Sequence, residues 1–198
     1  EMVIRDWSSD VCSSDLYSLL DGACRLNDVI ELAKENKMPA LAVTDHGNMF
    51  GAIEFYTAAR KAGVKPIIGC EAYVAGGSRL DKKPSSRWPD GGFHLVLLVK
   101  NLTGYHNLVK LASTAFLDGF YHRPRIDKEV LRQHSEGLIA TSACLKGEVA
   151  WNLLQGRTDE AVAVARELQE IFGEGNFFLE IQNHGLDQEK LLIPRMEA

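Results

Sequence analysis

Hydrophobic and polar residues follow two periods along most of the chain, and each period predicts one type of secondary structure. Apolar residues that recur every three or four positions predict helices over 26–36, 51–62, 103–118, 127–134, 147–154 and 158–172. Short continuous apolar runs predict buried strands over 38–44, 65–69, 93–100, 137–141 and 176–181. Gly, Ser, Pro and charged residues over 76–92 indicate a loop. Strands and helices that alternate in this way favour an α/β fold with a largely parallel sheet or barrel.

The first sixteen residues follow neither period. They read EMVIRDWSSDVCSSDL, and the tripeptide Ser-Ser-Asp occurs in them twice. A disordered polar arm is one interpretation. We favour another, because DWSSDVCSSDL resembles a translation of a common sequencing-adapter oligonucleotide, and we therefore treat 1–16 as non-native sequence and 17–198 as the folded domain. The apolar segment 191–196 begins a new element and stops, so we expect the domain to be incomplete at both ends.

Composition and charge exclude several classes of protein. The chain has 198 residues, of which 45% are hydrophobic and 25% charged, as is usual for a soluble globular domain. Lys and Arg number 22 against 27 Asp and Glu, so the net charge of −5 gives no sign of a DNA-binding face. The longest apolar runs, such as 95–99, are far shorter than the roughly 20 residues of a membrane span. Four cysteines without a CxxC pair, and no secretory signal, favour the reducing cytoplasm.

Potential metal ligands follow three of the predicted strands. Asp45 and His46 come after the first, Glu71 after the second and Cys144 after the strand over 137–141. Because the carboxyl ends of parallel strands meet at one edge, we expect these side chains to lie together. Asp21, in a turn near the start, would add a carboxylate. Together they form a ligand set suited to zinc, or to manganese or iron where oxygen ligands dominate.

Each of these residues also has an ordinary structural explanation. A single cysteine is usually a small buried apolar residue, and polar residues at strand ends often cap helices or bind turns. His94 is less well placed, because it opens its strand instead of following it. Cys70 should point away from Glu71, so we expect it to be structural. Arg123 and Arg125 are candidates for contacting a phosphate backbone, although surface salt bridges would explain them equally well.

Seven segments of the chain resemble one protein family closely. They resemble the N-terminal PHP domain of the alpha subunits of bacterial replicative DNA polymerase III, and they read YSLLDGACR (17–25), PALAVTDHGNMFGAIEFY (39–56), KPIIGCEAYVA (65–75), HLVLLVKNLTGYHNLVKLAS (94–113), GFYHRPRIDKEVL (119–131), HSEGLIATSACLKGEV (134–149) and NFFLEIQNHG (176–185). The resemblance implies a PHP-type distorted (β/α) barrel with several metal ions at its mouth.

The resemblance also implies roles for individual residues. The positions that match the family's metal ligands are Asp21, His46, Glu71, His94 and Cys144. Asp45 is better placed to orient a ligand than to bind metal itself. The family's opening His-x-His pair would fall on Cys12 and Ser14, within the segment we interpret as non-native, and its closing Asp-x-His pair would fall beyond residue 198.

For function, the resemblance implies a DNA-directed DNA polymerase as the full-length protein, with DNA and other replicase subunits as partners. The domain itself would be a phosphoesterase or 3′–5′ exonuclease that depends on divalent metal ions, namely Zn, Mn or Mg. Two alternatives stay open: a free-standing PHP phosphatase that acts on a small phosphate ester, and a structural PHP module without catalysis. No residue of this chain is assigned to nucleotidyl transfer.

Overall fold

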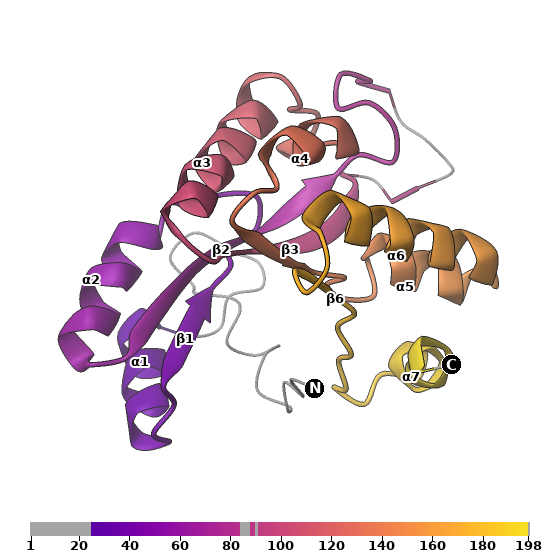
Figure 1. The fold of residues 1–198 in the computed structure, drawn as a ribbon. Helices are drawn as coiled ribbons and strands as arrows, with labels where there is room; N and C mark the ends of the chain where they lie inside the picture. Colours follow the sequence, from indigo (N-terminus) through magenta and orange to yellow (C-terminus); the bar gives the residue numbers. More distant parts are fainter. Residues whose placement is uncertain (1–24, 84–87, 90, 198) are drawn as a thin grey trace.

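The computed structural model describes residues 25–83, 88, 89 and 91–197 (Figure 1). The segment over 1–16 and the predicted ligand Asp21 lie outside these residues. The helices are α1 (Leu26–Glu35), α2 (Ala52–Ala62), α3 (Leu102–Leu117), α4 (Lys128–His134), α5 (Glu148–Leu154), α6 (Thr158–Phe172) and α7 (Asp187–Glu197). The strands are β1 (Ala40–Val43), β2 (Lys65–Val74), β3 (Phe93–Val99), β4 (Arg125–Ile126), β5 (Leu138–Thr141) and β6 (Phe177–Phe178).

The strands of the described residues form one mixed sheet, in the order β1-β2-β3-β5-β6, with β4 pairing to β2. The α/β class is confirmed. The sheet is open over these residues, and it is less parallel than predicted, because β3 runs antiparallel to both β2 and β5. The physical reason lies in the connection: no helix stands between β2 and β3 among the described residues, and a strand reached without a crossover helix can pair antiparallel with its neighbour.

The apolar residues form two clusters that flank the sheet. The larger lies between β2, β3, β5 and the helices α3 to α6, and it includes Leu97, Leu108 and Leu138. The smaller joins α1 and α2 to β1 and β2, and it includes Phe55, which is 1% exposed. In Figure 1 the helices α1 and α2 lie at one end of the sheet and α5 and α6 at the other, with β2 and β3 in the middle. The core therefore holds β2 and β3 at the centre of the molecule.

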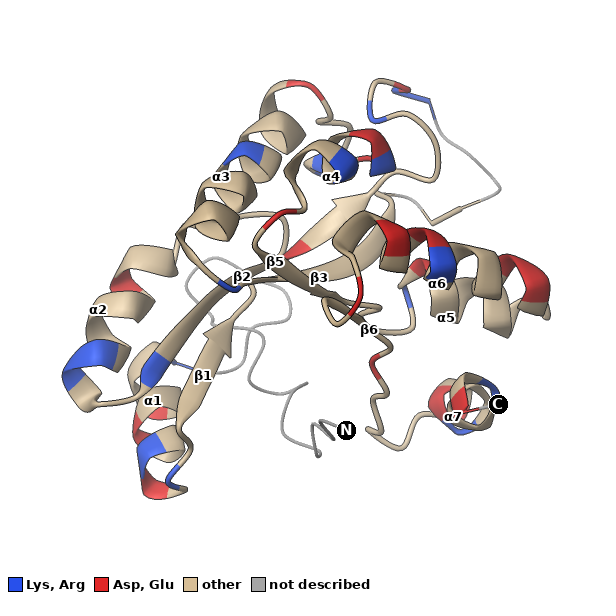
Figure 2. Ribbon diagram, viewed as in Figure 1, with Lys and Arg blue, Asp and Glu red and all other residues tan. Residues whose placement is uncertain are grey.

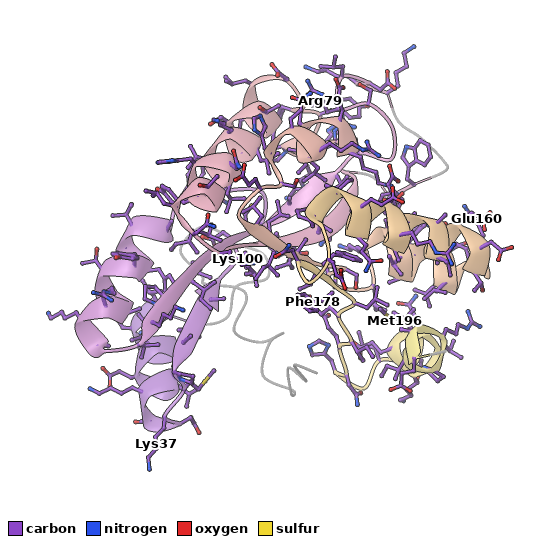
Figure 3. All side chains as sticks on the ribbon, in the orientation of Figure 1. Lys37, Arg79, Lys100, Glu160, Phe178 and Met196 are labelled. Carbon is purple, nitrogen blue, oxygen red and sulfur yellow. The ribbon has the colours of Figure 1, made fainter. Side chains whose placement is uncertain are left out.

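Two of the predicted helix boundaries have a clear local cause. The Asp127 carboxylate accepts from the backbone N–H of Val130 at 3.1 Å and so caps α4. Gly63 ends α2 with a φ of 82°, a conformation that glycine adopts without strain. Helix α7 was predicted only as an unfinished apolar element, and Figure 3 shows its Met196 on the side of the molecule where α5 and α6 lie.

Candidate metal centre

The alternation of side chains along β2 separates the core from the candidate site. Cys70, Ala72 and Val74 all belong to the larger apolar cluster. Glu71 and Tyr73 occupy the alternate positions, so they point to the other face of the sheet. Glu71 therefore lies inside β2, and not after its end as predicted, because the strand extends five residues beyond Gly69. Cys70 points into the core, as expected, where burial raises the pKa of its thiol to about 12.

His46 reaches Glu71 because the chain continues beside β2 after β1 ends. The backbone N–H of Glu71 donates to the carbonyl oxygen of Asp45 at 3.0 Å, and the N–H of Gly47 donates to that of Glu71 at 2.9 Å. These two bonds extend the parallel ladder of β1 and β2 and place His46 next to Glu71. Asp45 is 2% exposed. Its position beside a ligand agrees with the orienting role we predicted, which stays a prediction.

His94 lies at the site for a reason that the parallel-sheet prediction missed. Since β3 is antiparallel to β2 and β5, the beginning of β3 lies at the same edge of the sheet as the ends of those two strands. His94 pairs directly with Tyr73 across the ladder, so both side chains are on the face that carries Glu71. A residue that opens its strand is therefore as well placed as one that follows a strand.

Cys144 comes from the turn after β5. Its carbonyl oxygen accepts from the N–H of Gly147 at 2.8 Å, and the N–H of His94 donates to the carbonyl of Lys146 at 3.1 Å. These bonds bring the turn against the start of β3. The Cys144 Sγ lies 3.6 Å from His94 Nδ1 as a result.

Nitrogen, oxygen and sulfur atoms converge at this point. The His46, Glu71 and His94 side chains each offer a ligand atom, and these three atoms lie within 4.8 Å of one another. His46 Nδ1 is 3.5 Å from Glu71 Oε2, and His94 Nδ1 contacts Glu71 Oε1. The three side chains are only 10–19% exposed. Such a group of partly buried donors is the arrangement that a divalent cation requires.

The contacts of His94 favour a metal site over a cysteine nucleophile. In a Cys–His–carboxylate relay the cysteine and the carboxylate engage opposite nitrogens of the imidazole ring. Here Cys144 and Glu71 both approach Nδ1 of His94. Burial lowers the pKa of His94, but the contacts with Cys144 and Glu71 outweigh it and raise the pKa to about 9. Several donors that converge on one point fit a shared cation better than a proton relay.

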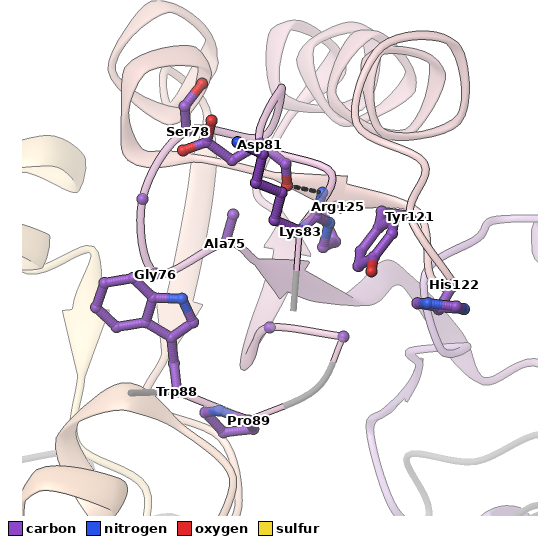
Figure 4. A pocket seen from close by; sticks show the side chains of 13 residues that line it. Ala75, Gly76, Ser78, Asp81, Lys83, Trp88, Pro89, Tyr121, His122 and Arg125 are labelled. Carbon is purple, nitrogen blue, oxygen red and sulfur yellow. Dashed lines mark hydrogen bonds between the residues drawn. The ribbon is translucent and has the colours of Figure 1, made fainter. Parts of the chain in front are cut away.

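The two arginines predicted to contact phosphate have different surroundings. Arg125 is 7% exposed, and its guanidinium donates to the backbone carbonyls of Gly119, Arg79 and Asp81, which stabilises the loop after β2. Arg125 is among the residues that line a cavity of about 320 Å³, whose side chains are drawn in Figure 4. These bonds give Arg125 a structural role, so a phosphate contact is not supported for it. Arg123 is exposed, with its guanidinium carbon 5.5 Å from the centre of the Tyr73 ring.

Tyr73 is part of the site and was not predicted from the sequence. Its ring lies 6.4 Å from that of His46 and 5.2 Å from that of His94, measured between centroids. The signal for it was the alternation that continues beyond the apolar run of β2, with Glu71 and Tyr73 two residues apart. The strand predicted from the apolar run ends at Gly69, so the prediction stops short of this alternation.

The surface of the described residues carries both signs of charge. Figure 2 shows Lys and Arg distributed over several helices, with Asp and Glu interspersed among them. No helix of the described chain has the length and apolar character needed to cross a membrane.

Comparison with known proteins agrees with the resemblance. The family model described as PHP domain matches residues 13–184. Proteins named DNA polymerase III subunit alpha are 56% identical over 176 residues in Thermus aquaticus and 49% identical over 181 residues in Treponema pallidum. These alignments include 88% and 90% of this chain but only 14% and 15% of the relatives, so the chain spans about a seventh of their length.

A solved structure from Bifidobacterium adolescentis, described as a candidate metal-dependent phosphoesterase, superposes with a TM-score of 0.44 at 12% identity over 87% of this chain and 77% of that one. That similarity is too low to inform the fold or the chemistry. The family match includes most of the chain, and with it the three converging ligands. The chain therefore belongs to the PHP domain family.

Proposed function

We propose that this chain is the PHP domain of a bacterial replicative DNA polymerase, and that it binds divalent metal ions and hydrolyses phosphodiesters as a 3′–5′ exonuclease. The observation that carries the proposal is the convergence of His46, Glu71 and His94 within 4.8 Å, with Cys144 beside them. The relatives named DNA polymerase III subunit alpha support the larger protein, in which DNA and replicase subunits are the partners and the cytoplasm is the location.

The residues present fit a metal of the zinc or manganese type. His46 and His94 would supply nitrogen, Glu71 oxygen and Cys144 sulfur, whereas magnesium prefers oxygen ligands alone. Asp21 would add a further carboxylate from outside the described residues. A bound divalent ion would supply Lewis-acid activation of water and would neutralise charge on the phosphate.

The protein's own residues would prepare that chemistry. The ladder from Asp45 to Gly47 fixes His46 against Glu71, and the cross-strand pairing fixes His94. Because the ligands are largely buried, their positions are set before any ion arrives, which reduces the reorganisation that binding requires.

The first experiment is to sequence the source DNA across codons 1–30 and beyond codon 198. We expect a His-x-His pair in place of Cys12 and Ser14, and a reading frame that continues into a polymerase. If 1–16 is genuine, two ligands are absent and the structural PHP module becomes the better proposal. A frame that stops soon after an Asp-x-His pair would favour the free-standing phosphatase.

The second experiment measures metal binding and hydrolysis by the complete gene product. We expect the wild type to bind Zn²⁺ or Mn²⁺ in equilibrium dialysis. Glu71→Gln should lose roughly 100-fold or more in affinity, because removing a residue that only hydrogen-bonds to a metal ligand already costs about 10–100-fold. Glu54→Gln, an equal change of charge on an exposed helix position, is the control.

Activity distinguishes the remaining alternatives. The proposal predicts that the wild type shortens 5′-labelled single-stranded DNA from its 3′ end, that EDTA stops this shortening, and that Glu71→Gln lacks the activity. Metal binding without hydrolysis would overturn the exonuclease in favour of a structural metal. Hydrolysis of p-nitrophenyl phosphate without DNA shortening would overturn it in favour of a small-ester phosphatase.

A further inference from the structure

Tyr73 lies beside both histidine ligands, whose own ring centroids are 5.8 Å apart, and it is held there by several contacts. Its ring is nearly parallel to that of His46, at an interplanar angle of 23°, and it meets the ring of His94 edge-on at 88°. Edge-to-face and stacked contacts at these separations are favourable and restrict the rotation of the rings involved. Tyr73 is only 7% exposed, so its own position is fixed by packing.

The turn that carries His46 has glycine at the point where it meets this ring. A Cβ on Gly47 would lie 2.9 Å from Cε2 of Tyr73 and 2.8 Å from Cγ of Pro124. Gly47 also has a φ of 69°, which a larger residue adopts only with strain. The absence of a side chain at this position allows the Tyr73 ring to pack directly against the ligand-bearing turn.

Arg123 lies over the face of the same ring. Its guanidinium carbon lies 5.5 Å from the ring centroid, within the range of a cation–π contact. The position follows from the topology, because β4 pairs with β2 at Tyr73 and the residues just before β4 therefore pass this ring. A tight turn orients them: the N–H of Tyr121 donates to the carbonyl of Arg123 at 3.1 Å, and His122 between them has a φ of 59°.

The guanidinium of Arg123 is accessible to a ligand. It is exposed, and it takes part in none of the ion pairs found among the described residues. Arg125, two residues later, uses its guanidinium on three backbone carbonyls. A guanidinium that rests on an aromatic face and keeps its N–H groups exposed can bind two phosphate oxygens at once.

We propose that Tyr73 and Arg123 form a phosphate subsite beside the metal ligands, in which Arg123 contacts the phosphate oxygens and Tyr73 is the positioning residue. Tyr73 contacts the rings of His46 and His94 and also supports the guanidinium of Arg123. The ligand class is a phosphate group, in either a diester or a monoester. This inference rests on the proposed metal centre and assigns its substrate-recognising side.

The positioning role is tested with the complete gene product and three variants. We expect Tyr73→Leu to lower the affinity for Zn²⁺ or Mn²⁺ by roughly 10-fold or more, measured by competition with a chromophoric chelator. Tyr73→Phe keeps the ring and should stay within about 2-fold of the wild type. Phe93→Leu removes another buried ring from the same sheet, one that faces Trp151, and should lower Tm without changing metal affinity.

The phosphate contact is tested separately by Arg123→Gln and Arg123→Lys. We expect both variants to bind metal like the wild type, and Arg123→Gln to weaken the binding of inorganic phosphate and to raise KM for DNA by roughly 10-fold or more, with a smaller change in kcat. Arg123→Lys should recover only part of the loss. Arg60→Gln, on an exposed position of α2, is the control. Binding of a phosphodiester-linked dinucleotide is then compared with binding of a nucleoside monophosphate, which shows whether the subsite takes a diester or a monoester.

The outcomes separate this inference from the proposed function. A wild type that binds neither metal overturns the metal centre itself. If the wild type binds metal and Tyr73→Leu binds it equally well, the positioning role is overturned and the centre stands. If Arg123→Gln binds inorganic phosphate as tightly as the wild type, the subsite is overturned.

Discussion

The two faces of the β2–β3 pair have opposite characters. One face carries Cys70, Ala72, Leu95 and Leu97, which are 0–7% exposed and pack into the larger apolar cluster. The other face carries the side chains of the candidate metal centre, namely Glu71, Tyr73 and His94. Residues that are adjacent in the sequence therefore serve different ends. Because side chains alternate along a strand, one segment can supply core residues to one face of the sheet and site residues to the other.

Burial has opposite effects on the free energy of folding at the two faces. Burying an apolar side chain of the size of leucine contributes about 2 kcal/mol to the stability of the fold, so the core face is stabilising without any ligand. Ionisable groups on the site face are partly buried, which costs free energy unless they are paired. A bound metal would offset that cost, and it would stabilise the folded state by an amount that grows with the logarithm of the metal concentration relative to Kd, so Tm would rise.

The largest effect is expected on the core face. Leu97 is 0% exposed, and Leu97→Ala should lower the free energy of unfolding by about 2–5 kcal/mol, because it leaves a cavity in a packed cluster. Urea denaturation of the metal-free protein measures this loss. The metal affinity of the folded variant should stay close to that of the wild type. A parallel fall in affinity would show that the two faces are not independent.

A smaller effect is expected from a charged residue that belongs to neither face. The Asp127 carboxylate caps α4 and pairs with the Arg79 guanidinium at 3.1 Å. Burial alone would raise the pKa of Asp127, but hydrogen bonds from the backbone N–H groups of Arg79 and Val130, together with the Arg79 guanidinium, lower it below the ordinary value. This stabilisation is complete above about pH 4, the unfolded value, and is lost as the pH falls through the folded pKa.

Asp127→Asn keeps the capping oxygen and removes the charge. We expect it to cost about 2 kcal/mol at pH 7 and to flatten the acid limb of stability against pH, measured by urea denaturation between pH 2 and pH 7. Glu129→Gln is the control, because Glu129 also approaches Arg79 but its side chain is 71% exposed, so about 0–1 kcal/mol is expected. An unchanged acid limb in Asp127→Asn would assign the acid sensitivity elsewhere.

The sequence predicted the helices and the α/β class well, because the helical segments are long and their apolar residues recur regularly. The helix over 158–172 matches α6 at both ends, and Gly63 ends α2 as expected. Sequence reasoning failed where tertiary pairing decides the structure. The strand predicted over 176–181 has only the ladder residues Phe177 and Phe178, and the two-residue β4 exists only because it pairs with β2.

The candidate site was predicted in part, and for a reason that can be traced. His46 and Cys144 follow strands as expected, so the rule of polar residues at strand ends located them. His94 was placed by resemblance alone, because strand direction cannot be read from a short apolar run. Tyr73 was missed because an aromatic residue in a strand usually belongs to the core, and only the register with His94 shows which face it occupies.

The smallest effect on stability is expected from Gly47→Ala. This substitution also best separates a loss of metal affinity from a loss of stability. Alanine at a φ of 69° is strained, so we expect a loss of about 1–2 kcal/mol in the free energy of unfolding. The added Cβ would also lie within 3 Å of Tyr73 and Pro124, so the turn that carries His46 or the Tyr73 ring beside it must shift. Metal affinity should therefore fall roughly 10-fold or more.

Gly63→Ala separates strain from contact. Gly63 has a φ of 82°, but a Cβ there would meet nothing within 4 Å. This variant should lose about 1–2 kcal/mol in urea from strain alone, while its metal affinity, measured by chelator competition, stays at the wild-type level. If both variants lose affinity equally, general destabilisation would explain the effect. If only Gly47→Ala loses it, the close packing of the turn against Tyr73 is what the site face requires, and stability and metal binding are then controlled by different residues of the same sheet.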